Sequence, residues 1–177
     1  MIENLINSGV PPELIVVTVS ALPILELRGA LPVAINIFHL PWYQALSLAI
    51  IGNLLPVPLL LLFFKSLTAV ARRSYTGKKL TDWLFRHTRK NIVVIEKYER
   101  TGLMLFVAIP LPGTGAWTGS VAAFLTGMKF NRALISITCG VIIAGVIVTC
   151  LSLLGWVGAV IAGLGLASLA AVGIWNI

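Results

Sequence analysis

The chain has 177 residues, of which 58% are hydrophobic and only 11% are charged, and its mean hydropathy is +0.99. Uncharged runs of the length seen here exclude an ordinary soluble domain, so the sequence predicts an integral membrane protein. The net charge of +7 does not indicate a nucleic-acid partner, because ten of the thirteen Lys and Arg residues fall in one segment, Lys65–Arg100.

That basic segment lies between apolar runs, which is typical of a cytoplasmic loop of a membrane protein. Its charges are expected to attract anionic lipid headgroups. Residues 1–9 contain an acid and no basic residue, so they lack the positive region of a cleaved signal peptide. The first apolar segment is therefore expected to stay in the mature protein.

Residues that carry catalysis or hold metals are scarce in this sequence. Cys139 and Cys150 lie in an apolar span with no His or acid nearby, so they indicate neither a disulfide framework nor a metal site. There is no Ser-His-acid arrangement, no pair of carboxylates and no metal-ligand spacing. The sequence predicts neither an enzyme nor a bound cofactor.

The first apolar segments are too short for ordinary membrane spans. Pro12–Leu25, with 14 residues, is followed by ELRGALP and by a second short segment that ends at Pro41. Because a full crossing needs about 20 apolar residues, we expect residues 12–41 to form a re-entrant helical hairpin. Its tip is predicted at Glu26–Pro32, with Pro32 breaking the helix.

A full span is expected next, over the 23 uncharged residues Trp42–Phe64. The Gly52-Asn53 pair and the prolines at 56 and 58 should kink it. The segment 65–100 then forms the basic loop.

The stretch Phe106–Gly119, read as FVAIPLPGTGAWTG, cannot be a continuous helix. Pro110 and Pro112 each remove a backbone donor, while the glycines at 113 and 115 permit turn dihedrals. Thr114 is a candidate N-cap for a new helix that begins near residue 115.

Unpaired backbone in hydrocarbon must be buried in protein or line a wet cavity, so this break indicates an internal site. We expect residues 101–128 to form a second re-entrant hairpin. The alternatives are a loop between two short spans and a proline kink that only shapes packing.

The chain ends in 45 uncharged residues, which Gly155 and Trp156 divide into spans at 133–154 and 156–177. With the basic loop in the cytoplasm, the two hairpins enter from opposite sides, the N-terminus lies outside and the C-terminus lies in the cytoplasm. The predicted fold class is an all-α integral membrane protein with a single membrane domain. Residues 1–64 and 101–154 form an inverted repeat of re-entrant helical hairpin plus transmembrane helix, with an extra C-terminal transmembrane helix.

The two halves also share a loose sequence match. The offset is 86 positions early and 88 later, so a two-residue insertion is required. The matched pairs are Gly29-Ala30 with Gly115-Ala116, Phe38 with Phe124, Ala45-Leu46 with Ala133-Leu134, and Gly52 with Gly140.

Glu26 and Arg28 are ionisable residues that apolar sequence flanks closely on both sides. An Arg near the bilayer centre costs roughly 2.5–3.5 kcal/mol, so it should have a partner or a wet cavity. If buried, Arg28 is a natural ligand for phosphate or carboxylate. Glu26 is expected to exchange a proton, because desolvation favours a neutral carboxyl. The alternative is that both are solvated charges of an outer loop.

The turn before residue 116 is expected to start a helix whose amides bind an anion. No Lys follows its glycines, so nucleotide binding is not expected. Asn53 and Thr118 are predicted to line a pathway, and the alternative for each is a hydrogen bond to a neighbouring helix. The predicted substrate-binding residues are Arg28, Gly29, Gly113, Thr114 and Gly115.

Three motifs in order, ELRGALP (Glu26–Pro32), IGNLLPVP (Ile51–Pro58) and VAIPLPGTGAWTG (Val107–Gly119), resemble the small multidrug export protein family over nearly the whole chain. That family looks distantly related to the DedA and VTT membrane proteins, which have two opposed re-entrant hairpins. DedA-like proteins are linked to translocation of polyprenyl-phosphate lipids, and their eukaryotic relatives to phospholipid scrambling. The resemblance implies the prokaryotic plasma (inner) membrane and makes Glu26 the counterpart of the embedded acid in the first DedA hairpin. No Arg stands near residues 110–112, where DedA-like sequences usually have one.

The leading hypothesis is a small polytopic transporter of an anionic amphiphile such as a polyprenyl phosphate or phospholipid. Arg28 and the PGTG turn would bind the head group, and Glu26 would couple movement to protons. A second hypothesis is proton-coupled export of small cationic molecules, with Glu26 as the binding acid. A third is a non-transporting membrane scaffold, in which Glu26 and Arg28 pair with each other. Membrane lipids, the substrate and, in a homodimer, a second copy are the expected partners.

Overall fold

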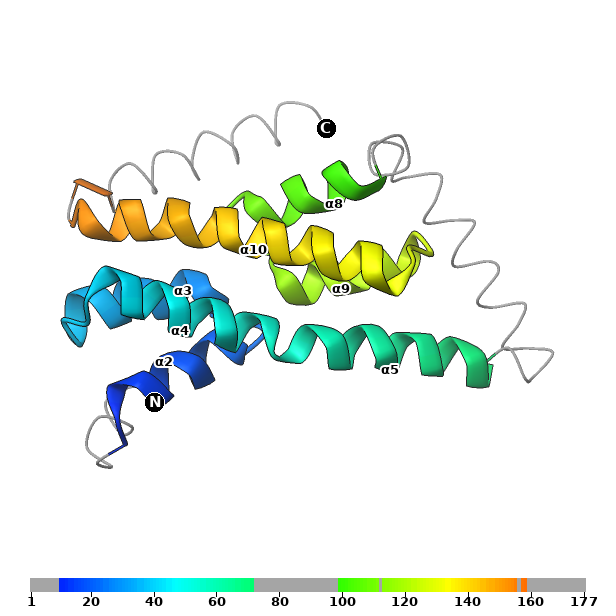
Figure 1. The fold of residues 1–177 in the computed structure, drawn as a ribbon, viewed down its shortest axis with the longest axis horizontal. Helices are drawn as coiled ribbons and strands as arrows, with labels where there is room; N and C mark the ends of the chain where they lie inside the picture. Colours follow the sequence, from blue (N-terminus) through cyan, green and yellow to red (C-terminus); the bar gives the residue numbers. More distant parts are fainter. Residues whose placement is uncertain (1–9, 72–98, 112, 156, 159–177) are drawn as a thin grey trace. The chain divides into compact units, whose positions relative to one another are not determined.

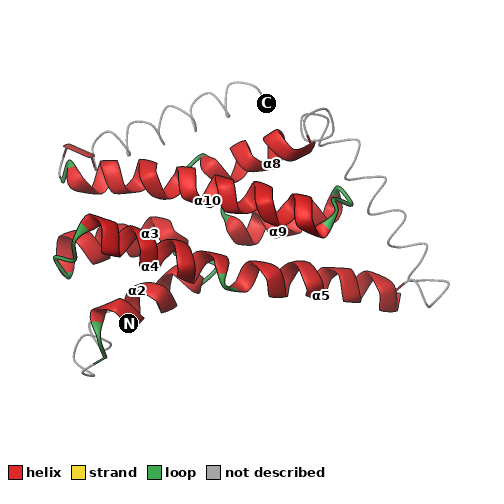
Figure 2. Cartoon of the chain, viewed as in Figure 1, coloured by secondary structure: helices red, strands yellow, loops and turns green. Residues whose placement is uncertain are grey.

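The computed structural model describes residues 10–71, 99–111, 113–155 and 157–158, and this part of the chain is mainly helical, without strands (Figures 1 and 2). Most of the predicted basic loop, and most of the last predicted span, lie outside the described residues. The helices are α2 (Pro12–Ala21), α3 (Glu26–Pro32), the π-helix η1 (Val33–Ile37), α4 (Trp42–Leu54), α5 (Pro56–Ala71), α8 (Glu99–Ala108), α9 (Ala116–Leu125) and α10 (Phe130–Leu153).

Two helical segments are long and apolar enough to cross a membrane, and they coincide with two of the predicted spans. Trp42–Phe64 has 23 residues and α10 has 24. At about 1.5 Å per residue, both exceed the roughly 30 Å of a bilayer core. In the most apolar stretch of each segment, the protein buries only 28% of the residues in Trp42–Phe64 and 44% in α10. A soluble core helix would be mostly covered, so this low coverage is consistent with two candidate membrane spans.

The chain divides into two compact units, residues 1–52 with 145–177 and residues 53–144. In the first unit, α2 packs against α3 and η1. In the second, α9 packs against α8 and α5, and the rings of Phe64 and Phe124 stack with centroids 5.1 Å apart. At 10 residues each, α2, α8 and α9 are about 15 Å long, half of a bilayer core. The first unit therefore contains one such short helix, α2, beside the helical stretch of α3 and η1, and the second unit contains two, α8 and α9.

The first turn does not lie where the sequence predicted it. ELRGALP, expected to form the tip of the hairpin, is helical and makes up α3. The chain turns earlier, at Leu22–Leu25, because Pro23 disfavours helical geometry at the preceding residue. Leu22 is accordingly extended, with φ −75° and ψ 140°.

Pro32, predicted to break the helix, lies inside it. Proline has no N–H to donate to the carbonyl four residues before it. Here the backbone changes from α-helix to π-helix directly after Pro32, so the helical course continues to Ile37. The chain leaves the helix at Phe38, and the next residue, His39, has a φ of +51°.

The predicted interruption of the first span is confirmed. Helix α4 ends at Leu54 and α5 begins at Pro56, a position where the missing N–H of proline is not needed. Helix α5 then continues to Ala71, seven residues past the predicted end of the span. The beginning of the predicted basic loop is therefore helical.

Glycines allow close helix crossings inside each unit. A Cβ at Gly52 of α4 would lie 2.9 Å from the Ser20 Cβ of α2 and closer still to the carbonyl oxygen of Val17. A Cβ at Gly140 of α10 would lie 2.7 Å from both the Met104 carbonyl oxygen and the Val107 Cβ of α8. Both contacts involve backbone, so neither position has room for a larger residue.

Candidate functional site

Glu26 stands at the first position of α3 and is 5% exposed. Its φ of +48° is in the left-handed region, which costs a residue with a Cβ roughly 1–2 kcal/mol. Its N–H donates to the Leu22 carbonyl at 3.1 Å, which closes the turn between α2 and α3. It is the one acidic side chain that is buried among the described residues. A strained, buried acid is the kind of position that occurs at functional sites.

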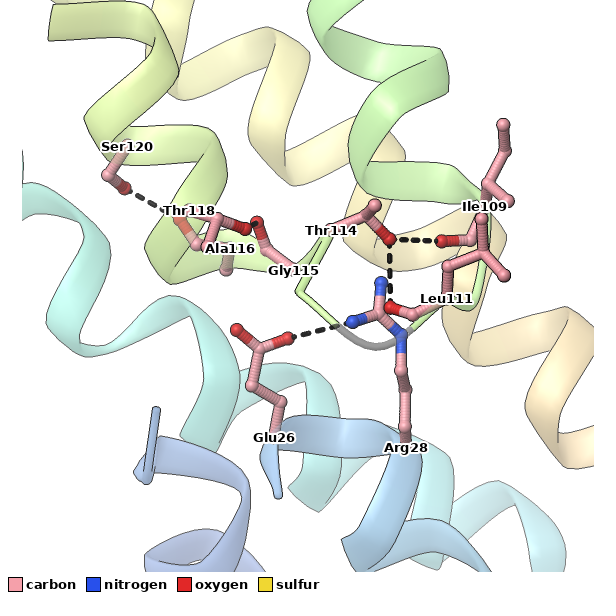
Figure 3. Close-up of polar contacts among 9 residues, drawn as sticks. All are labelled: Glu26, Arg28, Ile109, Leu111, Thr114, Gly115, Ala116, Thr118 and Ser120. Carbon is pink, nitrogen blue, oxygen red and sulfur yellow. Dashed lines mark hydrogen bonds and ion pairs between the residues drawn. The ribbon is translucent and has the colours of Figure 1, made fainter. Parts of the chain in front are cut away.

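Arg28 lies two residues further along α3 and donates from Nη1 to Glu26 Oε2 at 3.4 Å (Figure 3). Residues at this spacing do not share a face of a regular helix. The left-handed backbone of Glu26 is the irregularity at which this contact is made. The Arg28 side chain is 18% exposed and that of Glu26 is 6% exposed, so the arginine is the outer member of the pair.

The N–H of Gly29, a residue predicted to bind substrate, makes a hydrogen bond next to its own helix. Its N–H donates to the Leu25 carbonyl at 2.9 Å. A Cβ at Gly29 would meet Leu25 side-chain atoms at 3.1 Å, so packing accounts for a small residue here.

The predicted break in the second apolar run is confirmed. Helix α8 ends at Ala108 and α9 begins at Ala116. Pro110 cannot continue the helical hydrogen bonding, and Gly113 has a φ of +84° with nothing within 4 Å of an added Cβ. Backbone conformation, rather than lack of space, therefore requires glycine at position 113.

Thr114 is not the N-cap of α9, contrary to the sequence prediction. Its Oγ1 donates backward, lying 2.7 Å from the Ile109 carbonyl oxygen and 2.9 Å from that of Leu111 (Figure 3). Those carbonyls lie beyond the end of α8, so they have no regular helical donor and can accept from the hydroxyl. Gly115 is the N-cap, with extended backbone and no side chain to accept a bond. The Thr114 side chain therefore stabilises the turn that precedes α9.

The two predicted pathway residues differ in their hydrogen bonding. Thr118 is exposed and its Oγ1 donates to the Gly115 carbonyl at 3.1 Å, so its polarity is satisfied within α9. Asn53 is 1% exposed, and its Oδ1 has no hydrogen-bond partner within the described part of the chain. Of the two, Asn53 is the residue whose polarity the fold does not explain.

The site residues fall in both units. Glu26, Arg28 and Gly29 belong to the first, whereas Asn53, the 113–115 turn and Thr118 belong to the second. In the described residues, no three His, Cys, Asp or Glu side chains gather as a metal site would require. Sequence reasoning missed the strain at Glu26. A positive φ at a residue other than glycine leaves no signal in the sequence.

Residues 26–147 match the family described as Putative small multi-drug export protein. Neither the curated proteins nor the solved structures that were compared gave a match. The matched segment covers 122 of the 177 residues and begins at Glu26. It contains the ion pair, the interrupted span α4–α5, the 109–115 break and most of α10. The chain is thus a membrane protein that belongs to the small multi-drug export family.

Proposed function

We propose that the protein exports small organic molecules in exchange for protons, and that Glu26 is the group at which the exchange takes place. The observation that carries this proposal is a carboxylate that is 5% exposed, held at φ +48°, and in contact with Arg28 through Nη1 and Oε2 at 3.4 Å. The hypothesis of a non-transporting scaffold also predicted that Glu26 pairs with Arg28, but the family description favours an exporter.

Export driven by inward proton flow requires the proton and the substrate to compete for one group. A buried carboxylate must be neutralised, because a bare charge in a low-dielectric site is costly. Glu26 can be neutralised by Arg28, by a proton or by a cationic substrate. A contact as long as 3.4 Å is a weak hydrogen bond, so a cation that approaches more closely displaces Arg28. Protonation of Glu26 then releases the cation.

Transport of an anionic amphiphile is the second candidate, and one observation favours it. Arg28 is more exposed than Glu26, so the guanidinium is the partner that a ligand reaches first. Protonation of Glu26 would free Arg28 to bind a phosphate or carboxylate, for which its planar fork is suited. The contribution of the 113–115 turn to that site, and the relation to the DedA proteins, stay predictions.

An internal duplication would supply the alternating access that such exchange needs. Helices α2 and α8 both have 10 residues, and their ends are offset by 87 positions. Gly52 and Gly140, offset by 88, each press against the backbone of the short helix in their own unit. Ala45 and Ala133, also offset by 88, are both fully buried, and each N–H donates to the carbonyl four residues back.

The buried faces of α3–η1 and α9 support the same duplication. Their offset is 89, one more than the offset of the following helices, and the single extra residue of a π-helical turn in η1 accounts for the difference. The earlier matches of Gly29 with Gly115 and of Phe38 with Phe124 do not fit this register. The corresponding buried residues are Leu27, Ala30, Leu31 and Ala34 in the first unit and Ala116, Gly119, Ser120 and Ala123 in the second.

Charge-matched probes test the function. Inverted vesicles that contain the full chain would be given a proton gradient, and the uptake of the cation tetraphenylphosphonium or of the anion tetraphenylborate would be measured. Glu26→Gln should abolish proton-driven uptake of the cation, whereas the matched control Glu13→Gln, an acid on α2 that is not fully buried, should retain it. Arg28→Ala should strengthen cation uptake, because a competing charge is removed.

For the anion the expectation reverses: Arg28→Ala abolishes its movement and Glu26→Gln only slows it. Cation exchange at the wild-type rate in Glu26→Gln would refute the assignment of Glu26. Loss of anion movement in Arg28→Ala, with cation movement absent throughout, would establish the second candidate instead.

A further inference from the structure

The junction between α4 and α5 holds a buried polar group that the proposed exchange at Glu26 does not use. Asn53 is one residue from the end of α4, and its side chain is among the most deeply buried of the described residues, at 1% exposed. Its Oδ1 has no hydrogen-bond partner within the residues that the structure describes. An amide oxygen left unbonded in an apolar interior is costly, so a group that satisfies it is to be expected.

The residues that follow Asn53 make this junction poor in hydrogen-bond donors. Helix α5 opens with Pro56, Val57 and Pro58, so two of its first three residues have no N–H group. Pro58 also cannot donate to the carbonyl of Leu54, four residues before it. The junction therefore has fewer donors than an ordinary helix start, and α4 adds the negative end of its helix dipole.

The chemistry of these oxygens selects the ligand. A buried water could donate its two hydrogens to such oxygens, but it would find few donors here for its own lone pairs. A hard cation needs only oxygens, and carbonyls at helix interruptions are known to coordinate sodium in membrane transporters. Both oxygens are neutral, so a monovalent ion is better matched than a divalent one, which normally requires carboxylates. We propose that Asn53 Oδ1 and the Leu54 carbonyl bind a sodium ion at the α4–α5 junction.

Sodium-dependent stability tests this site without reference to transport. The purified full chain in detergent would be melted in sodium chloride and in choline chloride at equal ionic strength, and ²²Na⁺ binding would be measured directly. The wild-type chain should melt at a higher temperature in sodium. Asn53→Leu should remove that difference and weaken ²²Na⁺ binding by about tenfold or more, which corresponds to about 1.4 kcal/mol or more.

A matched control exists in α10. Thr149 Oγ1 is also buried, at 4% exposed, and has no hydrogen-bond partner in the described segments, but no proline follows it within the helix. Thr149→Val should therefore keep the sodium response. Pro58→Ala restores a donor for the Leu54 carbonyl and should weaken sodium binding with Asn53 intact, which provides a test if Asn53→Leu does not fold.

The outcomes separate this site from the exchange at Glu26. Glu26→Gln should leave the sodium response unchanged whether or not it abolishes export. A wild-type chain that melts at the same temperature in both salts would overturn the proposal and leave a bound water as the partner of Asn53. A sodium response that survives both Asn53→Leu and Pro58→Ala would overturn it as well.

Discussion

Replacing Gly52 with alanine tests whether the close crossing of α2 and α4 holds the first unit together. The new Cβ would lie 2.9 Å from the Ser20 Cβ and from the Val17 Cα, and nearer to the Val17 carbonyl oxygen. Contacts this short with backbone cannot be relieved by a rotamer change, so the two helices must move apart. Overpacking of this kind costs about 1–3 kcal/mol.

The gain in helix propensity offsets part of that cost. Alanine is favoured over glycine inside a helix by roughly 0.5–1 kcal/mol. Gly52→Ala should therefore destabilise the protein by about 1 kcal/mol at the centre of these ranges and by up to about 2.5 kcal/mol, and each 1 kcal/mol lowers the melting temperature of a chain of this size by roughly 2–4 °C.

Gly145→Ala is the matched control, because the obstacle there is a flexible side chain. Its Cβ would lie 2.9 Å from Leu46 Cδ1, a terminal methyl that can rotate away. This variant should be as stable as the wild type or slightly more stable. Size-exclusion chromatography of detergent-solubilised protein after graded heating would measure both. Equal melting of Gly52→Ala and Gly145→Ala would refute the argument.

Three other predictions follow from contacts within a single unit. The stacked rings of Phe64 and Phe124 should show a coupling free energy of about 0.5–1.5 kcal/mol in a double-mutant cycle with leucine, and additive losses would contradict their interaction. Thr114→Val should loosen the 109–115 turn by about 0.5–1.5 kcal/mol and increase its cleavage by protease, whereas Thr149→Val, which removes no bond to this turn, should not. Glu26→Gly should be more stable than Glu26→Ala by about 1 kcal/mol, because both lose the carboxylate but only glycine tolerates a φ of +48°; equal melting temperatures would exclude strain at this residue.

Helix interruptions proved predictable where proline acts through its missing N–H. Pro56 begins α5, where its missing N–H is not needed, and Pro110 follows the end of α8, where it cannot continue the helical hydrogen bonding. The two apolar spans could also be predicted from the sequence, since length and hydropathy are enough to identify them.

The first turn was misplaced because proline has two effects that compete. Pro32 was read as a helix breaker, yet its neighbours absorb the missing bond by forming a π-helix. Pro23 ends α2 through its effect on Leu22, the residue before it. Which effect dominates depends on whether the chain has packing partners beyond the proline, and a single sequence does not reveal them.

The sequence singled out the residues of the candidate site, whose role stays a prediction, but it did not give their geometry. Charge in an apolar setting identified Glu26 and Arg28, and their direct contact was an outcome that only the scaffold hypothesis required. The role of Thr114 was misassigned because its hydroxyl can bond either to a following N–H or to a preceding carbonyl. Carbonyls exposed by a broken helix decide that choice, and they are features of the fold.

The π-helix has a consequence for how relatives of this chain can vary in length. Residues 33–37 carry one residue more than an α-helix of the same rise would use. A lineage that lost a single residue here would tighten the segment into an α-helix and leave the buried face of α4 in place. The same deletion inside α4 would rotate every following side chain by about 100° and expose Ala49 and Gly52. Gaps among family members should therefore collect at 33–37 and avoid the helix that follows.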